Sequence, residues 1–278
     1  MAISGFLFDC DGTIFPKVEQ SHRAASINAI KTFYLQQNLQ FDGQAANKIW
    51  SDVLGGGILN FLQTYINRTE NFPTNIMTAE ELEYDYERSF LDLVRRVNTG
   101  EANDTEKDFF AVRKGFLPTI QNAYQTSVPV GVISNASQRI LEATGSTVPE
   151  INQIAGLILG SDTVVAAGGQ MKPAPDPFKQ GGEHFGIDLA DAVGYEDSGS
   201  GLLSLHHAGV GHIVFCDNKD GNAEEFAKIT QGVCVECTVE AEDDLLSIPC
   251  VSECFCQGMD ESAAYQPTGF GEPINGYS

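Results

Sequence analysis

The feature that most constrains the fold of this 278-residue chain is a set of short apolar runs that end abruptly at polar residues. Four such runs occur, namely residues 3–8 before Asp9, 128–133 before Ser134 and Asn135, 191–195 before Glu196 and Asp197, and 212–216 before Asp217. Apolar runs of this length, bounded by acidic or turn-forming residues, are typical of buried β-strands. We therefore expect strands at these positions, each with polar side chains at its carboxyl end.

Helical stretches separate the four runs, and strands that alternate with helices predict a parallel sheet with helices on both faces. The expected fold class is α/β, with a doubly wound (Rossmann-like) parallel sheet as its core. In such sheets, ligands bind at the carboxyl ends of the strands. The polar residues that follow the four runs are therefore candidates for a common site.

The segment from Lys17 to Val112 has a different pattern, in which apolar residues recur at helical spacing. Thr78 and Glu81 have the spacing of a capping box, in which two side chains satisfy free backbone donors at the start of a helix. An apolar stripe follows, made of Leu82, Tyr86, Phe90, Leu93 and Val97. We predict an all-helical insertion in the α/β core, with the polar residues 98–106 as its return linker.

The chain carries 16 basic and 38 acidic side chains, which gives a formal net charge of −22. A surface this negative repels nucleic-acid phosphates and anionic lipids, so we expect neither a nucleic acid nor a membrane as a partner. The same charge would repel a phosphorylated substrate. A phosphate site in this chain therefore needs local positive charge of its own, most simply a bound cation.

The N-terminal residues contain no basic segment, and Asp9 interrupts their apolar run, which argues against a signal peptide or a membrane span. Seven cysteines, an odd number, fit reduced thiols in a cytoplasmic protein, and Cys10 is expected within the first strand. Five cysteines near the C-terminus fit either a zinc knuckle or free thiols, which we prefer: Cys234, Cys237, Cys250, Cys254 and Cys256. Residues 258–278 lack periodicity and predict an irregular tail.

The sequence Asp9-Cys10-Asp11-Gly12-Thr13 carries the strongest chemical signal. Two carboxylates two residues apart at a strand end can both reach one point, and their mutual repulsion favours a cation between them. Magnesium takes oxygen ligands from carboxylates and from substrate phosphates. With the ion present, one carboxylate can attack phosphorus while the other handles a proton. Taken by itself, the pentapeptide fits a solvated acidic turn equally well.

Three further sites have both a chemical and a purely structural interpretation. Ser134 precedes a helix that we expect to begin near Ser137, so it can bind a phosphate oxygen or cap a helix. Lys172, stiffened by the prolines after it, can neutralise a transferring phosphoryl group or lie solvated on the surface. Glu196 and Asp197 can approach one metal ion or form an ordinary acidic turn. Their shared position at strand ends, or in the loops that follow, favours the chemical interpretation.

Taken in order, four segments resemble the four motifs of the haloacid dehalogenase superfamily, namely DCDGT, ISNAS, MKPAPDPF and GYEDSGSGLLSLHHAGV. The resemblance covers about residues 3–216 and is strongest to the branch with phosphoglycolate phosphatase, sugar-phosphate phosphatases and β-phosphoglucomutase. It implies a helical cap domain inserted between the first two motifs. The expected organisation is therefore an α/β core of residues 1–16 and 113–240, a helical cap of residues 17–112, and a C-terminal extension of residues 241–278.

The resemblance also implies a role for each motif residue and Mg²⁺ as the cofactor. Asp9 would be the nucleophile, and Asp11 would be the general acid and base. The ion would be held by the carboxylate of Asp9, the main-chain carbonyl of Asp11, and Asp197 with Glu196 near it. The phosphoryl group would be bound by Ser134, with Asn135 beside it, and by Lys172, which would bridge it to the nucleophile.

The chain departs from these relatives after the first motif, where Ile14-Phe15-Pro16-Lys17 lacks the acidic residue that often follows. The hinge of the cap and its substrate contacts can therefore differ. His22 is a candidate substrate contact, with a solvated helix position as the alternative. Gly56, within the run of residues 55–57, is a candidate in a flexible cap loop that faces the site, with a plain helix–helix turn as the alternative.

The expected function is that of a magnesium-dependent phosphatase that hydrolyses a small phosphorylated metabolite, such as a sugar phosphate or a phosphoglycolate-like compound, through an aspartyl-phosphate intermediate. The first alternative is a β-phosphoglucomutase-like phosphomutase, and the missing acid after Phe15 favours hydrolysis over it. A catalytically silent binding protein of the same fold is a second alternative, against which the intact acidic residues and Lys172 argue. Dehalogenation is a third, but that reaction needs neither Asp11 nor magnesium.

Overall fold

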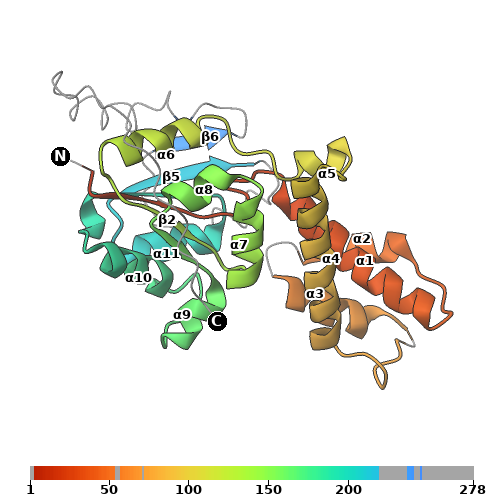
Figure 1. Ribbon diagram of the computed structural model, residues 1–278. Helices are drawn as coiled ribbons and strands as arrows, with labels where there is room; N and C mark the ends of the chain where they lie inside the picture. The colour runs from red at the N-terminus through yellow and green to blue at the C-terminus, as the bar shows by residue number, and fades with distance from the viewer. Residues whose placement is uncertain (1–2, 54–56, 71, 219–236, 241–244, 246–278) are drawn as a thin grey trace, which may run out of the picture.

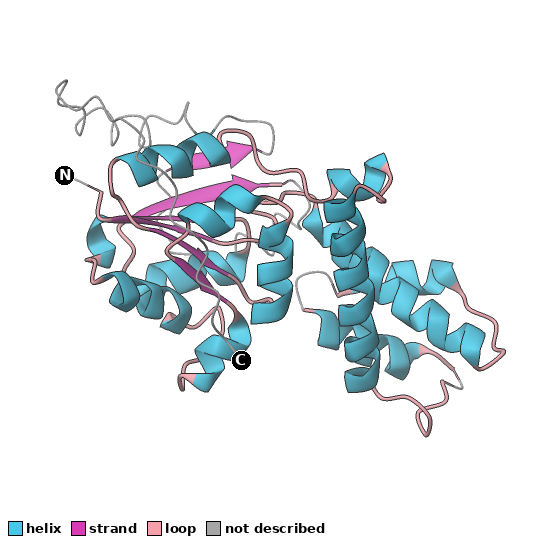
Figure 2. Cartoon of the chain, viewed as in Figure 1, coloured by secondary structure: helices cyan, strands magenta, loops and turns pink. Residues whose placement is uncertain are grey.

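The computed structural model describes residues 3–53, 57–70, 72–218, 237–240 and 245. These residues form two lobes (Figure 1), and one of them is a β-sheet between two layers of helices. Among its described residues, the other lobe consists of helices and loops alone (Figure 2). It is formed by the helices within residues 18–108, which lie between the first and the second strand.

Within the described residues, six parallel strands form the sheet, in the spatial order β3-β2-β1-β4-β5-β6. They are β1 (Gly5–Phe8), β2 (Val130–Ile133), β3 (Leu157–Leu159), β4 (Ala192–Glu196), β5 (His212–Asp217) and β6 (Cys237–Glu240). Phe8 of β1 lies opposite Val132 on one side and Tyr195 on the other. The predicted α/β fold with a doubly wound parallel sheet is confirmed.

Alternate residues of β1, β2, β3 and β5 enter separate apolar cores on the two faces of the sheet. In β1, the side chains of Phe6 and Phe8 join one core, and the side chain of Leu7 joins the other. The first face is covered by α6 (Phe116–Gln125), α7 (Gln138–Ser146) and α8 (Pro149–Ile154). The second is covered by α9 (Ser161–Ala166), α10 (Asp176–Phe185) and α11 (Gly199–Ala208), with a 3-10 turn at Leu189–Asp191 before β4.

The helical lobe has an apolar core of its own, which includes the buried aromatic residues Phe33, Trp50, Phe61 and Tyr65. Its helices are α1 (Val18–Gln36), α2 (Gly43–Asp52), α3 (Ile58–Arg68), α4 (Ala79–Thr99) and α5 (Asp104–Asp108). The predicted capping box at the start of α4 is confirmed, because Thr78 and Glu81 each accept the other's backbone N–H. The N-terminal part of α1, with Val18 and Ala25, and the C-terminal half of α4, with Phe90 and Leu93, also pack into the core of the sheet lobe.

Two details of the sequence prediction are wrong. Residues 98–106 do not form a single linker, because α4 continues to Thr99 and a second capping box, between Asn103 and Glu106, starts α5. Cys10 does not lie within β1 but in the turn beyond it, where it is buried. β3 could not be predicted, because its three residues are mostly half-buried and form too short a pattern.

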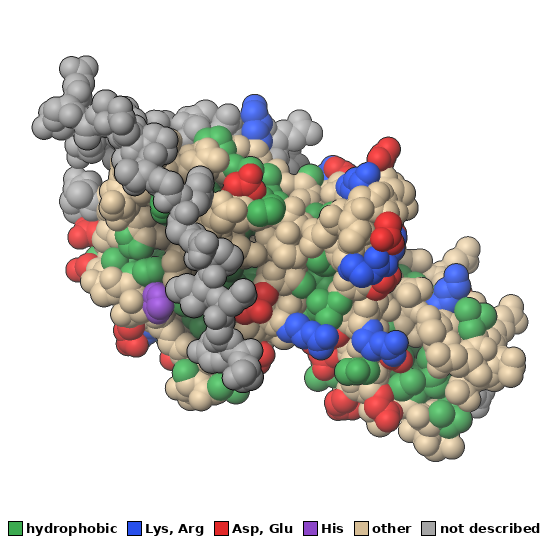
Figure 3. Space-filling view, viewed as in Figure 1, with side chains coloured by type: hydrophobic (Ala, Val, Ile, Leu, Met, Phe, Trp, Pro, Cys, Tyr) green, Lys and Arg blue, Asp and Glu red, His purple; other side chains and the backbone are tan. Residues whose placement is uncertain are grey.

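Several predictions concern residues outside the described part of the chain. They include Gly56, the irregular tail of residues 258–278, and the late cysteines other than Cys237, which lies in β6. None of the described helices is both long and apolar enough to cross a lipid bilayer. On the face shown in Figure 3, basic and acidic side chains lie next to one another over the helical lobe, where Arg95 and Arg96 of α4 pair with acidic neighbours.

Candidate active site

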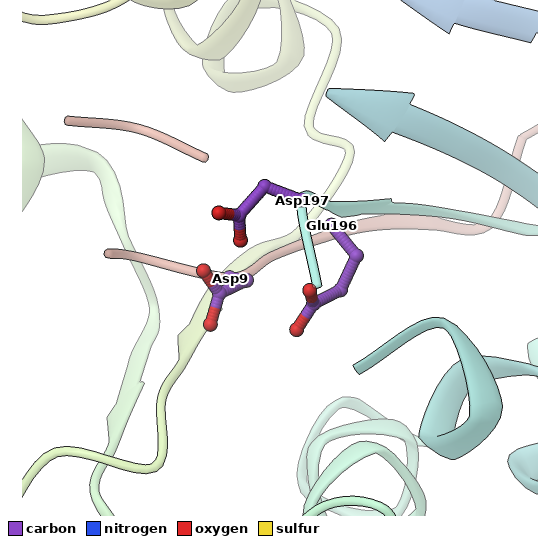
Figure 4. Close-up of side chains that lie close together, drawn as sticks. All are labelled: Asp9, Glu196 and Asp197. Atoms are coloured by element: carbon purple, nitrogen blue, oxygen red, sulfur yellow. The ribbon is translucent and has the colours of Figure 1, made fainter. Parts of the chain in front are cut away.

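Three carboxylates meet at the carboxyl ends of two neighbouring strands. Asp9 follows β1, while Glu196 ends β4 and Asp197 comes directly after it. The strand order reverses between β1 and β4, which is where sheets of this kind leave a crevice for ligands. One oxygen from each of the three carboxylates lies within 4.8 Å of the others. Figure 4 shows the three side chains gathered around a common space.

Lys172 is the buried cation of this cluster, and its Nζ donates to three oxygens. The acceptors are Asp9 Oδ1 at 2.7 Å, Glu196 Oε1 at 2.7 Å and the main-chain oxygen of Ile133 at 2.9 Å. The loop before α10 carries the lysine, and the ammonium lies 4.9 Å from the ring centre of Phe178. Burial alone would lower the pKa of Lys172, but the charges of Asp9 and Glu196 raise it. The side chain of Lys172 therefore stays cationic although it is buried.

Asp9 and Asp197 carry more negative charge than the single lysine can balance. Burial, together with the charge of Glu196, raises the pKa of Asp9 to about 8. Burial, together with the charge of Asp9, raises the pKa of Asp197. Among the described residues, the buried Oδ2 of Asp9 has no hydrogen-bond partner. An unpartnered carboxylate oxygen in a buried acidic cluster fits a hard divalent cation such as Mg²⁺, because the ion would supply both the missing contact and the missing charge.

Among the described residues, Glu196 accepts three hydrogen bonds, which is more than Asp9 or Asp197 accepts. Oε1 accepts from Lys172, and Oε2 accepts from the backbone N–H and the hydroxyl of Ser198, each at 2.9 Å. Gly201 allows this arrangement, since a Cβ at that position would overlap the Glu196 carboxylate. Glu196 is thus held in place mainly as a partner of Lys172. Asp9 Oδ2 has no donor among the described residues, and each oxygen of Asp197 accepts one longer bond, of 3.4 or 3.2 Å, so these two carboxylates are better placed to bind a cation.

The side chain of Asp11 belongs to a separate part of the site. Its Oδ2 accepts from the hydroxyl of Ser134 at 3.4 Å, and its Oδ1 lies 3.6 Å from His22 Nε2. Burial would raise the pKa of Asp11, but the nearby imidazole of His22 and the charge of Lys172 lower it. Gly12, with φ at +86°, makes the turn that separates Asp11 from the cluster, and a Cβ there would overlap Asp197. The carboxylate of Asp11 therefore faces the Ser134 side of the crevice.

Ser134 and Asn135 lie at the end of β2, as the sequence predicts, but their side chains have different partners. The buried hydroxyl of Ser134 reaches Asp11 and accepts the backbone N–H of Ala136 at 3.0 Å. The amide of Asn135 donates to the main-chain oxygen of Lys172 at 3.2 Å and accepts its backbone N–H at 3.1 Å. Asn135 therefore fixes the loop that carries Lys172, a contact that the sequence does not reveal.

The helical lobe contributes His22 to the site. This residue of α1 is 7% exposed, so the solvated position considered from the sequence is wrong. Its Nδ1 shares a hydrogen bond of 2.8 Å with the hydroxyl of Tyr86, and its ring stacks on Phe90. Its Nε2 faces Asp11 and has no hydrogen-bond partner among the described residues. The apolar stripe that contains Tyr86 and Phe90 predicted the helix but not this contact.

Sequence reasoning missed Arg113 and Asn218, which lie next to the acidic cluster. Arg113 donates to the carbonyl oxygens of Gly12 and Thr13, and Asn218 donates to Asp197 Oδ2 at 3.2 Å. Neither residue stands in a motif, and a lone arginine or asparagine is normally a surface residue. The only available signal was their position, directly after the helical segment and directly after β5.

Comparison with known proteins gives a family and a fold. The family model of the haloacid dehalogenase-like hydrolases matches residues 3–209. No curated protein sequence matches the chain. Among solved structures, CbbY from Rhodobacter sphaeroides in complex with phosphate has a TM-score of 0.69 at 19% identity, with 90% of this chain and 99% of that chain covered. Another CbbY structure, of a mutant, contains xylulose-(1,5)bisphosphate, with a TM-score of 0.68 at the same identity, and covers 90% and 98% of the chains.

Two further solved structures have the same fold. β-Phosphoglucomutase from Clostridium difficile has a TM-score of 0.59 at 16% identity, with 92% of this chain and 98% of that chain covered. The putative hydrolase YfnB from Bacillus subtilis, bound to magnesium, has a TM-score of 0.57 at 13% identity, with 88% and 98% covered. These low identities show a common fold alone. Because the family model spans about three quarters of the sequence and includes Asp9, Lys172 and Asp197, the chain belongs to the haloacid dehalogenase-like hydrolases.

Proposed function

We propose that this protein is a magnesium-dependent phosphatase that hydrolyses a small phosphorylated metabolite through an aspartyl phosphate on Asp9. The observation that carries the proposal is the buried Oδ2 of Asp9, which lies next to Asp197 and has no hydrogen-bond partner among the described residues, while Lys172 contacts Oδ1. Because Oδ2 makes no hydrogen bond to the described residues, both of its lone pairs remain available, one for the cation and one for attack on phosphorus. The neighbouring lysine lowers the cost of bringing an anionic phosphoryl group to it.

Asp9 and Asp197 would hold the cation, with the main-chain carbonyl of Asp11 as a further ligand implied by the resemblance to the family. Glu196 would act mainly through Lys172, because its oxygens already accept three hydrogen bonds of 2.7–2.9 Å. When bound, Mg²⁺ would neutralise charge on the carboxylates and on the phosphoryl oxygens. The remaining chemistry belongs to the side chains of this chain.

In the first step, Asp9 would attack phosphorus while Asp11 gives a proton to the leaving oxygen. The lowered pKa of Asp11 means that the free protein holds this carboxyl ionised near neutral pH. It would take up its proton as the anionic phosphoryl group arrives, because nearby negative charge favours the protonated form. In the second step, the ionised Asp11 would take a proton from water, which attacks phosphorus and releases phosphate from Asp9.

Ser134 and Lys172 would hold the phosphoryl oxygens during transfer. Both side chains are buried at the crevice, and both already contact one of the two catalytic carboxylates. Asn135 would contribute by fixing the Lys172 loop. Phosphoryl transfer requires mainly positioning and charge neutralisation, and these residues supply both.

The helical lobe would serve as a cap that covers the site and selects the substrate. Its boundaries would follow the sequence expectation, with residues 17–112 as the cap and residues 1–16 and 113–240 as the core. His22 supports this role, because it reaches the crevice from α1 and its Nε2 lies 3.6 Å from Asp11 Oδ1. A sugar phosphate is the substrate class that we propose, since the similar CbbY fold has been seen with a sugar bisphosphate.

A phosphomutase is the second candidate, favoured by the likeness to β-phosphoglucomutase and by the buried His22 near Asp11. A mutase would pass the phosphoryl group of Asp9 to a sugar hydroxyl rather than to water. Hexose 1-phosphate distinguishes the two, because a mutase forms hexose 6-phosphate and a phosphatase releases free phosphate. We expect free phosphate as the main product.

The test of the proposal is a screen of phosphorylated metabolites and p-nitrophenyl phosphate, with Mg²⁺ or with a chelator. We expect phosphate release that needs Mg²⁺ and is lost in Asp9→Asn. Asp104→Asn, an exposed aspartate of α5, is the matched control and should keep full activity. Release that continues in chelator, or at the wild-type rate in Asp9→Asn, would rule out the proposed mechanism.

A further inference from the structure

Arg113 is a buried cation at the point where the chain returns from the helical lobe to the sheet lobe. Its side chain is 1% exposed and is the largest of the fully buried side chains. The backbone N–H of Arg113 donates to Ile14 at 2.8 Å, which joins the return segment to the outgoing one. A buried guanidinium is retained only where its donors are well used, so its partners indicate its role.

The guanidinium holds the turn that follows Asp11. Nε donates to the main-chain oxygen of Thr13 at 2.8 Å, and Nη2 donates to the main-chain oxygen of Gly12 at 2.9 Å. Nη2 also donates to Asn218 Oδ1 at 2.6 Å. Because the guanidinium is planar and rigid, these bonds fix the positions of the two carbonyl groups relative to each other.

Asn218 extends the network from Arg113 to the acidic cluster. Its Nδ2 donates to Gly12 at 2.8 Å and to Asp197 Oδ2 at 3.2 Å. The other oxygen of Asp197 accepts from the hydroxyl of Thr13 at 3.4 Å. Arg113 therefore holds both groups that orient Asp197: it binds the carbonyl of Thr13, and it binds the amide oxygen of Asn218.

Arg113 also contributes to the orientation of the Asn218 amide, together with the Gly12 carbonyl and the Asp197 carboxylate. The two ends of an asparagine amide have nearly the same shape, so hydrogen bonds decide between its orientations. With Arg113 present, the oxygen faces the guanidinium and the NH₂ group faces Asp197. Without Arg113, the amide oxygen loses this donor, and the amide is held less firmly against Gly12 and Asp197.

We propose that Arg113 is a positioning residue for the cation site, acting through Asn218 and Thr13 on Asp197. This inference rests on the proposed function in one respect, the binding of a cation by Asp9 and Asp197, and makes no use of the proposed substrate. Residues that orient the ligands of a metal typically change its affinity by about 10- to 100-fold when they are removed. The arginine also connects the attachment of the helical lobe to the geometry of the cation site.

The test measures Mg²⁺ affinity of the full-length protein by calorimetry, without substrate. Arg113→Met and Asn218→Ala should each weaken binding by about 10- to 100-fold. The double variant should be no weaker than the weaker single variant, because both changes break one network. Arg96→Met removes an arginine that pairs with Glu106 in the helical lobe and should leave Mg²⁺ affinity unchanged.

A purely structural role for Arg113 predicts a different result. Loss of Arg113 would then lower thermal stability, while the folded protein would bind Mg²⁺ as tightly as the wild type. Asn218→Ala keeps the bonds from Arg113 to the turn, so it tests the link to Asp197 even where Arg113→Met folds poorly. Wild-type affinity in Asn218→Ala, or additive losses in the double variant, would overturn the inference.

The same measurements separate this inference from the proposed function. A wild-type protein that binds Mg²⁺ but hydrolyses none of the phosphorylated compounds would contradict the phosphatase, while the network could still be supported by the variant affinities. Phosphatase activity with unchanged Mg²⁺ affinity in both single variants would contradict the network alone. A wild-type protein that binds no Mg²⁺ would contradict both.

Discussion

Replacing Lys172 by methionine removes the buried cation while keeping a side chain of similar length and volume. The change deletes three hydrogen bonds at Nζ, two of them to the carboxylates of Asp9 and Glu196. Because the methionine fills most of the same space, the cost of a cavity is small. The main effect is a buried negative charge that has lost its partner.

The size of this effect should depend on pH. Removing one partner of a buried ion pair costs about 3–5 kcal/mol in free energy of unfolding. The carboxylate that has lost its partner can avoid this cost by taking up a proton. Holding that proton costs about 1.4 kcal/mol for each pH unit above about 4, the pKa of a carboxyl group in the unfolded chain, so the smaller of the two costs applies. We therefore expect Lys172→Met to lose about 1 kcal/mol at pH 5 and about 3–5 kcal/mol at pH 8 in metal-free protein.

Urea unfolding followed by far-UV circular dichroism measures this loss. Tryptophan fluorescence is less suitable, because the single tryptophan, Trp50, lies in the core of the helical lobe. Lys179→Met, which changes an exposed lysine of α10, is the control and should cost under about 0.5 kcal/mol. Saturating Mg²⁺ should reduce the loss in Lys172→Met, while the rate of phosphate release should stay about 100- to 1000-fold below wild type.

A loss below about 1 kcal/mol at pH 8 in metal-free Lys172→Met would refute this reasoning, because an uncompensated buried carboxylate would then cost almost nothing. A loss of the same size at pH 5 and pH 8 would also refute it. In that case the destabilisation would come from altered packing around Phe178 rather than from charge.

Three further outcomes follow from the same structure. In metal-free protein, burial and Glu196 raise the pKa of Asp9 from 3.8 to about 8, so the folded state keeps a proton that the unfolded state releases. The contribution of this proton to stability is complete below about pH 4 and is lost as the pH rises through about 8. The free energy of unfolding should therefore fall by about 1.4 kcal/mol per pH unit between these limits. Thermal melts that show no fall, or the same fall with Mg²⁺ as without, would contradict this prediction. Gly12→Ala should lower the free energy of unfolding by about 1–3 kcal/mol through strain at φ +86°. It should also weaken Mg²⁺ binding, because the new methyl group displaces Asp197. Calorimetry that gives wild-type Mg²⁺ affinity would argue against the close approach of residues 12 and 197. Thr78→Ala removes the N-cap of α4 and should lower the free energy of unfolding by about 1 kcal/mol, with unchanged kcat. A loss of activity in fully folded Thr78→Ala protein would show that the start of α4 acts on the site.

The strand-end residues could be predicted from the sequence because an apolar run that stops at an acid has few other interpretations. Asp9, Ser134, Glu196 and Asp197 all follow from that pattern, and the structure brings them to one edge of the sheet. The helical lobe followed from spacing, and the start of α4 followed from the chemistry of Thr78. These are local signals, readable within a few residues.

The contacts between distant segments could not be predicted. Arg113 reaches Gly12 across about 100 positions of sequence, and nothing beside either residue indicates the pairing. Likewise, the burial of His22 depends on Tyr86 and Phe90 of α4, whose apolar spacing predicts a helix but no partner. Tertiary packing, rather than local propensity, decides such contacts.

The central claim is that Asp9 attacks phosphorus, and chemical trapping tests it most directly. The protein would be mixed with Mg²⁺ and a substrate found in the metabolite screen, quenched during turnover, and treated with borohydride, which reduces an aspartyl phosphate to homoserine. We predict homoserine at position 9, only in the presence of both Mg²⁺ and substrate, and none in Asp9→Asn. Phosphate release by the wild type with residue 9 unmodified would contradict the account.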